Sequence, residues 1–341
     1  MARITLVVAA LIASLQLCAA SPAPPSRRAD ANITSSCTNK AQRKAWHNLT
    51  DAEKKEYIDA ELCVMNSPAK SGIEVAQNRW DELTYAHLVQ SNFMHRVGAF
   101  LPWHRYFMYT HEYILRNECN YTGYQPYWNE LLDADRSTNV SESIVFDPDT
   151  GFGGEGGDCV TDGPFVNVTL HLHEEWGVIE QYDYCLSRNF SDTGFQGANS
   201  TYVDACMATE NFTAADECFR SSPHTAGHAG VGGVMLDVSA SPADPLFFLH
   251  HTNLDRLWWN WQQASPENRT YDIGQIENVP ILSYLLSNEF LFPDTLLPYA
   301  NDHSNITTLN HTLWMVDILP NVTIADVMDL GGELICAEYI E

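Results

Sequence analysis

Basic residues are scarce in this 341-residue chain, which has 18 lysines and arginines against 44 aspartates and glutamates. The formal net charge of −26 argues against a nucleic-acid partner, because no basic patch could overcome the repulsion from phosphates. It equally argues against binding to an anionic membrane surface. The simplest role of the charge is solubility outside a cell.

Long apolar runs are also rare. The only one extends from Leu6 to Leu17, after Arg3 and before the small residues 19–21, as in a secretory signal peptide. It is short for a membrane span, and no second run of spanning length follows. We therefore predict a signal peptide over residues 1–20 and a secreted, extracellular protein without a membrane anchor.

Residues 21–34 are rich in proline and contain the dibasic pair Arg27-Arg28. We predict that this segment is a short propeptide or a flexible N-terminus. Internal repeats and interior linkers are missing from the rest of the chain. Residues 35–341 are therefore predicted to form one domain, which is long enough to bury a large core.

Cysteines are few, and their number is compatible with a small set of disulfide bonds. Nine occur, and removal of Cys18 with the signal peptide leaves eight. An even number in a secreted chain predicts disulfides, although the sequence leaves their connectivity open. The pairing that we predict is Cys37–Cys336, Cys63–Cys119, Cys159–Cys185 and Cys206–Cys218.

Asn-X-Ser/Thr sequons, by contrast, are abundant. Twelve in a signal-bearing chain predict N-linked glycans and place most of these segments at the surface. The sequons begin at Asn32, Asn48, Asn120, Asn139, Asn167, Asn189, Asn199, Asn211, Asn268, Asn305, Asn310 and Asn321.

Helical signals dominate the chain. They cover residues 50–65, 80–95, 106–119 and 245–263. Thr50 and Glu53 form a capping-box pattern, and Pro102 marks an expected break before the third segment.

Irregular structure is expected elsewhere. Residues 147–168 are rich in glycine and should form a loop tied by Cys159, while residues 312–316 and 322–324 fit short strands. The sequence therefore predicts a mainly α fold with long disulfide-tied loops and minor β structure.

Thirteen histidines occur, and their placement is uneven. One group comprises His87, His95 and His104, and another comprises His224 and His228 with the pair His250-His251. His224 and His228 are four residues apart, so on a helix they share one face and can hold one ion. A single histidine is more often an ordinary buried or surface residue, but two groups of three in aromatic-rich helical segments are hard to obtain by chance.

Cysteine and carboxylate do not occur at matching ligand spacing, so the candidate sites consist of imidazoles alone. Imidazole suits copper, zinc, iron and nickel, and the ligand type does not choose among them.

Two segments around these histidines resemble the signatures of a known family. Phe100-Leu-Pro-Trp-His-Arg-Tyr-Phe107 resembles the first-copper signature of tyrosinases, catechol oxidases and molluscan haemocyanins. Asp244-Pro-Leu-Phe-Phe-Leu-His-His-Thr-Asn-Leu-Asp255, with the residues up to Trp258, resembles their second-copper signature. The segment from Cys37 to Trp46 resembles the short secreted fungal members. The similarity extends from about residue 37 to at least residue 262.

This resemblance implies a helical bundle that encloses two copper ions within a tyrosinase-like catalytic domain. The implied copper-A ligands are His87, His95 and His104, and the implied copper-B ligands are His224, His228 and His251. In the family pattern the second histidine of the adjacent pair is the ligand, so His250 is expected to face elsewhere.

The resemblance also implies roles for two neighbours of His251. Phe247 lies one turn before it and would wall the metal pair from solvent. Asp255 lies one turn after it and would accept a hydrogen bond from a ligand N–H. Both have ordinary alternatives, namely core packing for Phe247 and an ion pair with Arg105 or Arg256 for Asp255.

The implied activity is the oxidation of small phenolic substrates by O₂. In the family, Asn after the first copper-B histidine favours monophenol hydroxylation, and Thr225 occupies that position here. We therefore expect oxidation of o-diphenols (catechols) to o-quinones. Val238 aligns with the residue that overhangs copper A, and its small size should leave the entrance open. The alternatives are a tyrosinase with true monophenol hydroxylation and an o-aminophenol oxidase.

A non-catalytic oxygen carrier of the haemocyanin type is a more distant alternative, because it uses the same copper pair. Carriers cover the site with an extra domain, and this chain ends at Glu341 without one, so we expect an enzyme. A zinc protein with similar histidines is a third reading, which metal analysis would exclude.

Overall fold

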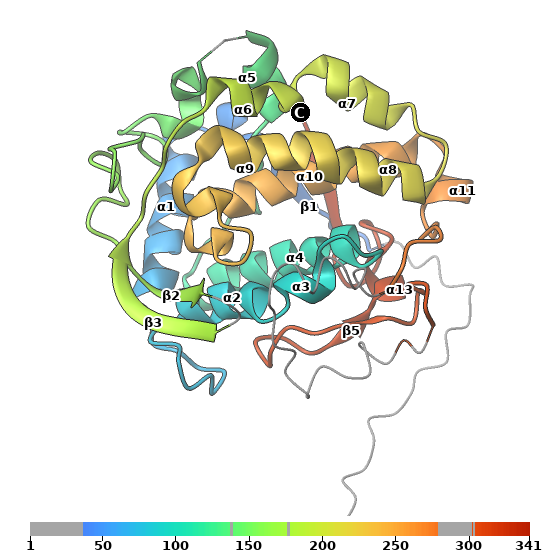
Figure 1. The fold of residues 1–341 in the computed structure, drawn as a ribbon, viewed down its shortest axis with the longest axis horizontal. Coiled ribbons are helices and arrows are strands. Elements are labelled where there is room, and N and C mark those ends of the chain that lie inside the picture. The colour runs from blue at the N-terminus through green and yellow to red at the C-terminus, as the bar shows by residue number, and fades with distance from the viewer. Residues whose placement is uncertain (1–36, 137–138, 176–177, 279–301, 303) are drawn as a thin grey trace, which may run out of the picture. The chain divides into compact units, whose positions relative to one another are not determined.

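Helices dominate the computed structural model, which describes residues 37–136, 139–175, 178–278, 302 and 304–341 (Figure 1). This confirms the predicted mainly α fold. The helices are α1 (Asp51–Asn66), α2 (Arg79–Leu88), α3 (Ser91–Met94), α4 (Phe100–Glu118), α5 (Glu130–Arg136), α6 (Asp192–Phe195), α7 (Ser200–Met207), α8 (Phe212–Phe219), α9 (Thr225–Val231), α10 (Leu246–Gln263), α11 (Pro266–Arg269) and α13 (Ile324–Val327). The segments predicted to be a signal peptide and a propeptide lie outside the described residues.

No helix in the described part of the chain combines the length and apolar character that a membrane crossing requires.

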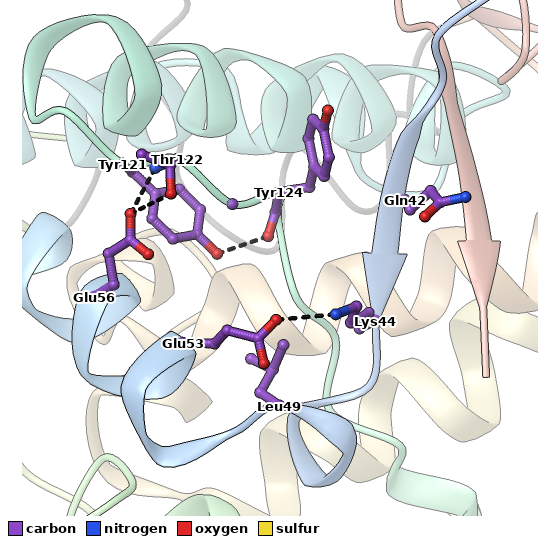
Figure 2. Close-up of a pocket in the computed structure, with 9 residues that line it drawn as sticks. Gln42, Lys44, Leu49, Glu53, Glu56, Tyr121, Thr122 and Tyr124 are labelled. Atoms are coloured by element: carbon purple, nitrogen blue, oxygen red, sulfur yellow. Dashed lines mark hydrogen bonds and ion pairs between the residues drawn. The ribbon is translucent and has the colours of Figure 1, made fainter.

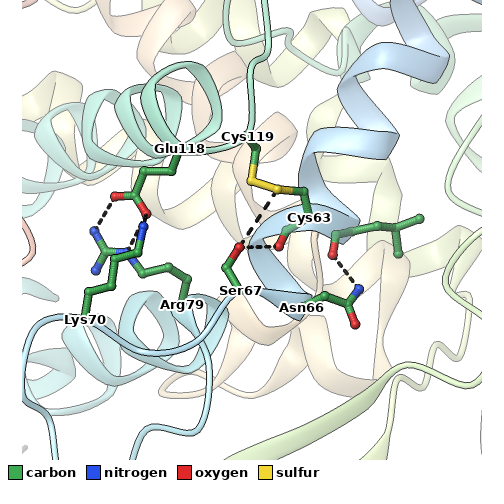
Figure 3. The surroundings of a disulfide bond; sticks show 8 residues. Cys63, Asn66, Ser67, Lys70, Arg79, Glu118 and Cys119 are labelled. Atoms are coloured by element: carbon green, nitrogen blue, oxygen red, sulfur yellow. Dashed lines mark hydrogen bonds and ion pairs between the residues drawn. A yellow bond between two sulfur atoms is a disulfide. The ribbon is translucent and has the colours of Figure 1, made fainter.

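Helix α1 begins as its sequence predicts. The Thr50 side chain accepts a hydrogen bond from the Glu53 backbone N–H at 3.3 Å, and the Glu53 carboxylate accepts one from the Thr50 N–H at 2.8 Å. The Cys63–Cys119 disulfide links α1 to the residue after α4 (Figure 3). Beside it, Glu118 forms ion pairs with Lys70 and Arg79, which connect the end of α4 to the start of α2.

Two helix boundaries differ from the predictions. Helix α4 begins at Phe100, so Pro102 lies in its first turn and does not break it. Proline is tolerated there, because the first backbone N–H groups of a helix have no acceptor within the helix. The segment predicted as one helix over residues 80–95 is divided into α2 and α3.

Helices α4 and α10 pack against each other at the centre of the core. Every side chain of α10 from Leu246 to Trp258 is buried, including Phe247 and Phe248. This packing brings the two predicted copper signatures together, because α4 contains most of the first and α10 contains most of the second.

The strands form three small pairs. They are β1 (Ala41–Lys44) with β6 (Ala337–Ile340), β2 (Thr169–Glu175) with β3 (Val178–Cys185), and β4 (Thr312–Leu313) with β5 (Val322–Thr323). The β1–β6 pair is parallel and the other two are antiparallel. The short β4–β5 pair confirms the strands expected in the tail, whereas the β2–β3 hairpin has no counterpart among the predictions.

The four predicted disulfides are all present. Residues 147–168 contain no helix or strand, as predicted, and Cys159 connects this loop to the end of β3 through Cys185. Cys37–Cys336 joins the start of the described chain to the residue before β6, next to the β1–β6 pair.

Candidate metal centre

The first histidine group comes from three consecutive helical segments. His87 lies in the last turn of α2, His95 follows α3, and His104 lies in the first half of α4. Their ring centroids are 5.2 to 5.6 Å apart, and one nitrogen from each lies within 4.8 Å of the others. All three are buried. The structure thus brings together the three residues predicted as copper-A ligands.

The second group is assembled around a local widening of the helix. Pro223 has no N–H to donate, and residues Arg220–His224 form a π-helical segment that ends at the first histidine. His228 lies one turn further along, in α9, and its Nε2 is 3.3 Å from the Nε2 of His251 in α10. Two nitrogens bound at about 2.0 Å to one tetrahedral ion would have a separation of about this size.

The two groups are adjacent. The rings of His104 and His251 stack with centroids 4.3 Å apart and an angle of 11° between their planes. The Phe247 ring packs against both groups, with centroid distances of 5.2 Å to His87 and 4.1 Å to His251. Phe247 is fully buried. Phe247 therefore packs between the two groups, which fits both the predicted wall and its alternative, ordinary core packing.

Backbone carbonyls fix the orientation of five of the rings. Nδ1 of His95, His104 and His224 donates to the carbonyl four residues earlier, at 2.7, 2.8 and 3.3 Å respectively. Since a carbonyl oxygen can only accept, each Nδ1 carries the proton and each Nε2 keeps its lone pair. This is the orientation in which a histidine can bind a metal through Nε2.

One loop orients a histidine in each group. The Met235 carbonyl accepts from Nδ1 of His228 at 2.6 Å, and the Ser239 carbonyl accepts from Nδ1 of His87 at 2.8 Å. The loop is connected to β2 by a hydrogen bond from the Ser239 hydroxyl to Glu174 at 3.0 Å. Residues 235–239 thus position both groups, a role that no spacing in the sequence indicated.

Burial keeps these imidazoles neutral. It lowers the pKa of His95 to about 4 and that of His228 to about 3. For the other four predicted ligands, burial and then neighbouring histidines lower the pKa well below 6.5. These four residues are His87, His104, His224 and His251.

The neutral imidazoles have the properties that a metal site requires. Within the described residues, Nε2 of His87, His104 and His224 is buried without a hydrogen-bond partner. An unpaired buried nitrogen costs about 1–3 kcal/mol unless something binds it. Two adjacent groups of such nitrogens therefore fit two imidazole-preferring ions such as copper.

His250 does not face away from the second group, and the expectation that it would is wrong. One of its ring nitrogens lies within 4.8 Å of those of His224, His228 and His251. Its Nδ1 is 2.5 Å from Oε1 of Glu130, at the start of α5. Glu130 was not identified from the sequence, because nothing in the spacing relates it to a residue 120 positions away. The sequence offered one signal, the position of Glu130 soon after the aromatic pair Tyr127-Trp128.

Asp255 does not accept a hydrogen bond from a histidine of the site, so that expectation is corrected. Its Oδ1 accepts from Arg105 Nε at 2.6 Å, and its Oδ2 accepts from the Tyr339 hydroxyl at 2.5 Å. Buried Arg43 lies 3.5 Å away. Because the carboxylate is buried between two arginines, it forms the ion pair that was the alternative reading.

The predicted substrate-pocket residues lie at the exposed edge of the site. Thr225 is exposed, and its hydroxyl donates to the Arg220 carbonyl at 3.0 Å. Val238 is 59% exposed and precedes Ser239, which orients His87. Leu236, in the same loop, is 56% exposed. Two exposed apolar side chains and the exposed Thr225 are thus close in the chain to residues of the two groups.

A separate surface pocket lies between β1, α1 and residues 121–124 (Figure 2). Four of its polar side chains form two pairs: Glu53 with Lys44 at 2.9 Å, and Glu56 with Thr122 at 2.7 Å. It contains none of the predicted site residues.

Comparison with known proteins identifies the family. A family model described as the common central domain of tyrosinase matches residues 77–264, a range that contains both histidine groups. The tyrosinase-like protein phomQ1' of Diaporthe leptostromiformis is 35% identical over 271 residues, which cover 71% of this chain and 68% of that protein. The chain belongs to the tyrosinase family.

Other tyrosinase-family proteins match more of the chain. Tyrosinase ustQ of Aspergillus flavus is 30% identical over 325 residues, covering 89% of this chain and 80% of that protein. A solved structure of a mutant polyphenol oxidase from Thermothelomyces thermophila superposes with a TM-score of 0.75, at 25% identity and 89% coverage of both chains. Members of this family bind a type-3 dicopper centre and are copper oxidoreductases.

Proposed function

We propose that this protein is a dicopper oxidase that converts o-diphenols to o-quinones with O₂. In this proposal His87, His95 and His104 hold copper A, and His224, His228 and His251 hold copper B. The observation that carries it is the pair of adjacent groups of neutral imidazoles with unpaired nitrogens, the first buried and the second partly buried. Zinc has no redox chemistry, so zinc ions at these sites could not carry out the oxidation.

When bound, each of the two copper ions could accept or donate one electron. Together they would suit a reaction that removes two electrons from each catechol. The overall change is two catechols and one O₂ to two o-quinones and two waters. The protein contributes the fixed imidazoles, the buried Phe247 ring that excludes water from one side, and the exposed edge at Thr225 and Val238.

The substrate preference follows from Thr225. Its side chain is shorter than that of Asn, and its hydroxyl hydrogen is donated to the Arg220 carbonyl at 3.0 Å, so it is a poorer partner for fixing a water that would deprotonate a monophenol. An unperturbed phenol has a pKa of about 10, and a monophenol therefore needs such help near neutral pH. A catechol has a second oxygen and needs no hydroxylation.

We further propose that the protein is secreted and carries N-linked glycans. Disulfides are typical of oxidising compartments, and the structure contains four. Most sequon asparagines in the described residues are exposed, among them Asn48, Asn120 and Asn305.

The experiment is a substrate panel on copper-loaded protein, with catechol, tyramine, o-aminophenol and methoxyphenols. We expect rapid oxidation of catechol and slow oxidation of tyramine, measured as oxygen uptake. Thr225→Asn should raise the tyramine rate relative to the catechol rate. Equal rates for tyramine and its catechol counterpart in the wild type would contradict the preference and favour a tyrosinase with monophenol hydroxylation.

A matched variant separates the hydrogen-bonding group from the shape of the side chain. Thr225→Val keeps the shape but removes the hydroxyl, and it should retain the diphenol preference. Oxygen binding without turnover of any phenol would identify an oxygen carrier instead.

A further inference from the structure

Glu130 and His250 form a buried pair directly behind the second histidine group. The two side chains are 2% and 1% exposed, and Nδ1 of His250 lies 2.5 Å from Oε1 of Glu130. Oε2 of Glu130 accepts a second hydrogen bond, from Asn253 in α10, at 3.3 Å. The Glu130 carboxylate is therefore held by two side chains, His250 and Asn253, that lie about one turn apart on α10.

The His250 ring packs against two of the proposed copper-B ligands. Its centroid is 4.5 Å from that of His228, with the rings at 76°, and 5.5 Å from that of His224, with the rings at 28°. Its Nε2 is buried without a partner among the described residues. No comparable fourth imidazole accompanies the copper-A group within the described residues.

Gly227 leaves the space that this pair occupies. It lies between His224 and His228, and a Cβ there would be 2.3 Å from the His250 ring and 2.8 Å from Glu130 Oε1. Such distances are too short for any real contact, so a side chain at this position would displace the pair. The close approach explains why a glycine interrupts α9 between two proposed ligands.

We propose that Glu130 and His250 are positioning residues that set the affinity of the copper-B site. Glu130 holds the His250 ring in one orientation, and that ring supports the imidazoles of His224 and His228. A carboxylate that accepts from a metal-ligating histidine raises metal affinity by about 10- to 100-fold. Glu130 acts one residue further from the ion, through His250, so its loss should cost about 10-fold, the lower end of that range. The inference rests on the proposed function, because it assumes that the second group holds copper.

The test is a copper titration of chelator-stripped protein in competition with a chelator of known affinity. Glu130→Met has a similar length but no acceptor oxygen, and it should weaken the binding of one of the two coppers by about 10-fold. The other copper should keep its affinity. Glu130→Gln, whose amide oxygen can accept the same hydrogen bond, should restore most of the loss.

Two further variants complete the test. The first identifies which copper site is weakened, and the second disturbs the Glu130–His250 pair through Gly227. The electron paramagnetic resonance spectrum of the single copper in Glu130→Met should match that of His251→Ala, which lacks a proposed copper-B ligand. Gly227→Ala keeps every hydrogen-bonding group but intrudes on the pair, so it should weaken the same copper.

The matched control is the other buried histidine–glutamate pair. Nε2 of His111 lies 3.0 Å from Oε2 of Glu61, both side chains are fully buried, and the His111 ring stacks on Phe248 of α10 at 3.6 Å. Glu61→Met should lower the melting temperature but leave both copper affinities unchanged.

The inference is overturned if Glu130→Met binds both coppers as tightly as the wild type. It is also overturned if Glu61→Met weakens the same copper equally, since the effect would then be general destabilisation. A wild-type protein that binds no copper overturns the proposed function and this inference with it. Two tight coppers in both the wild type and Glu130→Met overturn the inference alone.

Discussion

Burial determines the protonation state of the histidines in the site. Burial lowers the pKa of His228 and of His250 to about 3, far below the ordinary value of 6.5. At neutral pH each ring therefore keeps a lone pair, which metal binding requires. The same burial has a cost in the absence of a metal, because a proton gained by these residues on unfolding favours the unfolded chain.

We predict that the metal-free protein becomes less stable as the pH falls from about 7 to about 4. Unfolded histidines bind protons near pH 6.5, whereas folded His95 does so only near pH 4. In this window the unfolded state binds more protons, so the free energy of unfolding decreases as the pH decreases. Urea unfolding of chelator-treated protein at several pH values would measure this change in the free energy of unfolding.

Two buried acids oppose this trend. Burial raises the pKa of Asp216 to about 7 and that of Glu130 well above its usual range, so both bind protons earlier in the folded state. They are outnumbered by the histidines of the two groups. A free energy of unfolding that rises toward pH 4.5 would show that the acids dominate.

At the scale of elements, the Arg105–Asp255 ion pair links α4 to α10. Each residue is close to a proposed ligand in sequence: Arg105 follows His104, and Asp255 lies one turn after His251. Asp255→Leu would leave Arg105 and Arg43 buried without their shared carboxylate. We predict a loss of about 3–5 kcal/mol in the free energy of unfolding, measured in urea.

An exposed ion pair provides the comparison. Lys55 and Asp59 are four residues apart on α1 and largely exposed, and Asp59→Leu should cost about 1 kcal/mol or less. A loss for Asp255→Leu as small as that for Asp59→Leu would contradict the proposed link between the two helices.

Sequence patterns predicted the structural features that depend on residues close together in the chain. The capping box at Thr50, the uninterrupted helix of α10 and the loop over residues 147–168 all follow from patterns within a few residues. The contact of His250 with Glu130 and that of Asp255 with Tyr339 did not, because each joins side chains more than 80 positions apart in the chain. The Arg105 partner of Asp255 was one of the alternatives that the sequence offered. The π-helical turn before His224 and the β2–β3 hairpin were also missed, although both form from residues close together in the chain.

At the scale of the whole molecule, the site is assembled from segments that long-range links hold in place. The Cys37–Cys336 disulfide and the β1–β6 pair join residues almost 300 positions apart. Tyr339, in β6, reaches Asp255 in α10, so the last strand also contacts the helix that bears His251. The histidine groups thus belong to one connected core, although their spacing alone was enough to single them out.

The central claim is that two groups of three histidines hold two copper ions. Metal analysis of protein prepared with excess copper tests it most directly. We predict two coppers per chain in the wild type and one in His251→Ala, with no zinc retained. One copper per chain in the wild type, or zinc in place of copper, would contradict the claim.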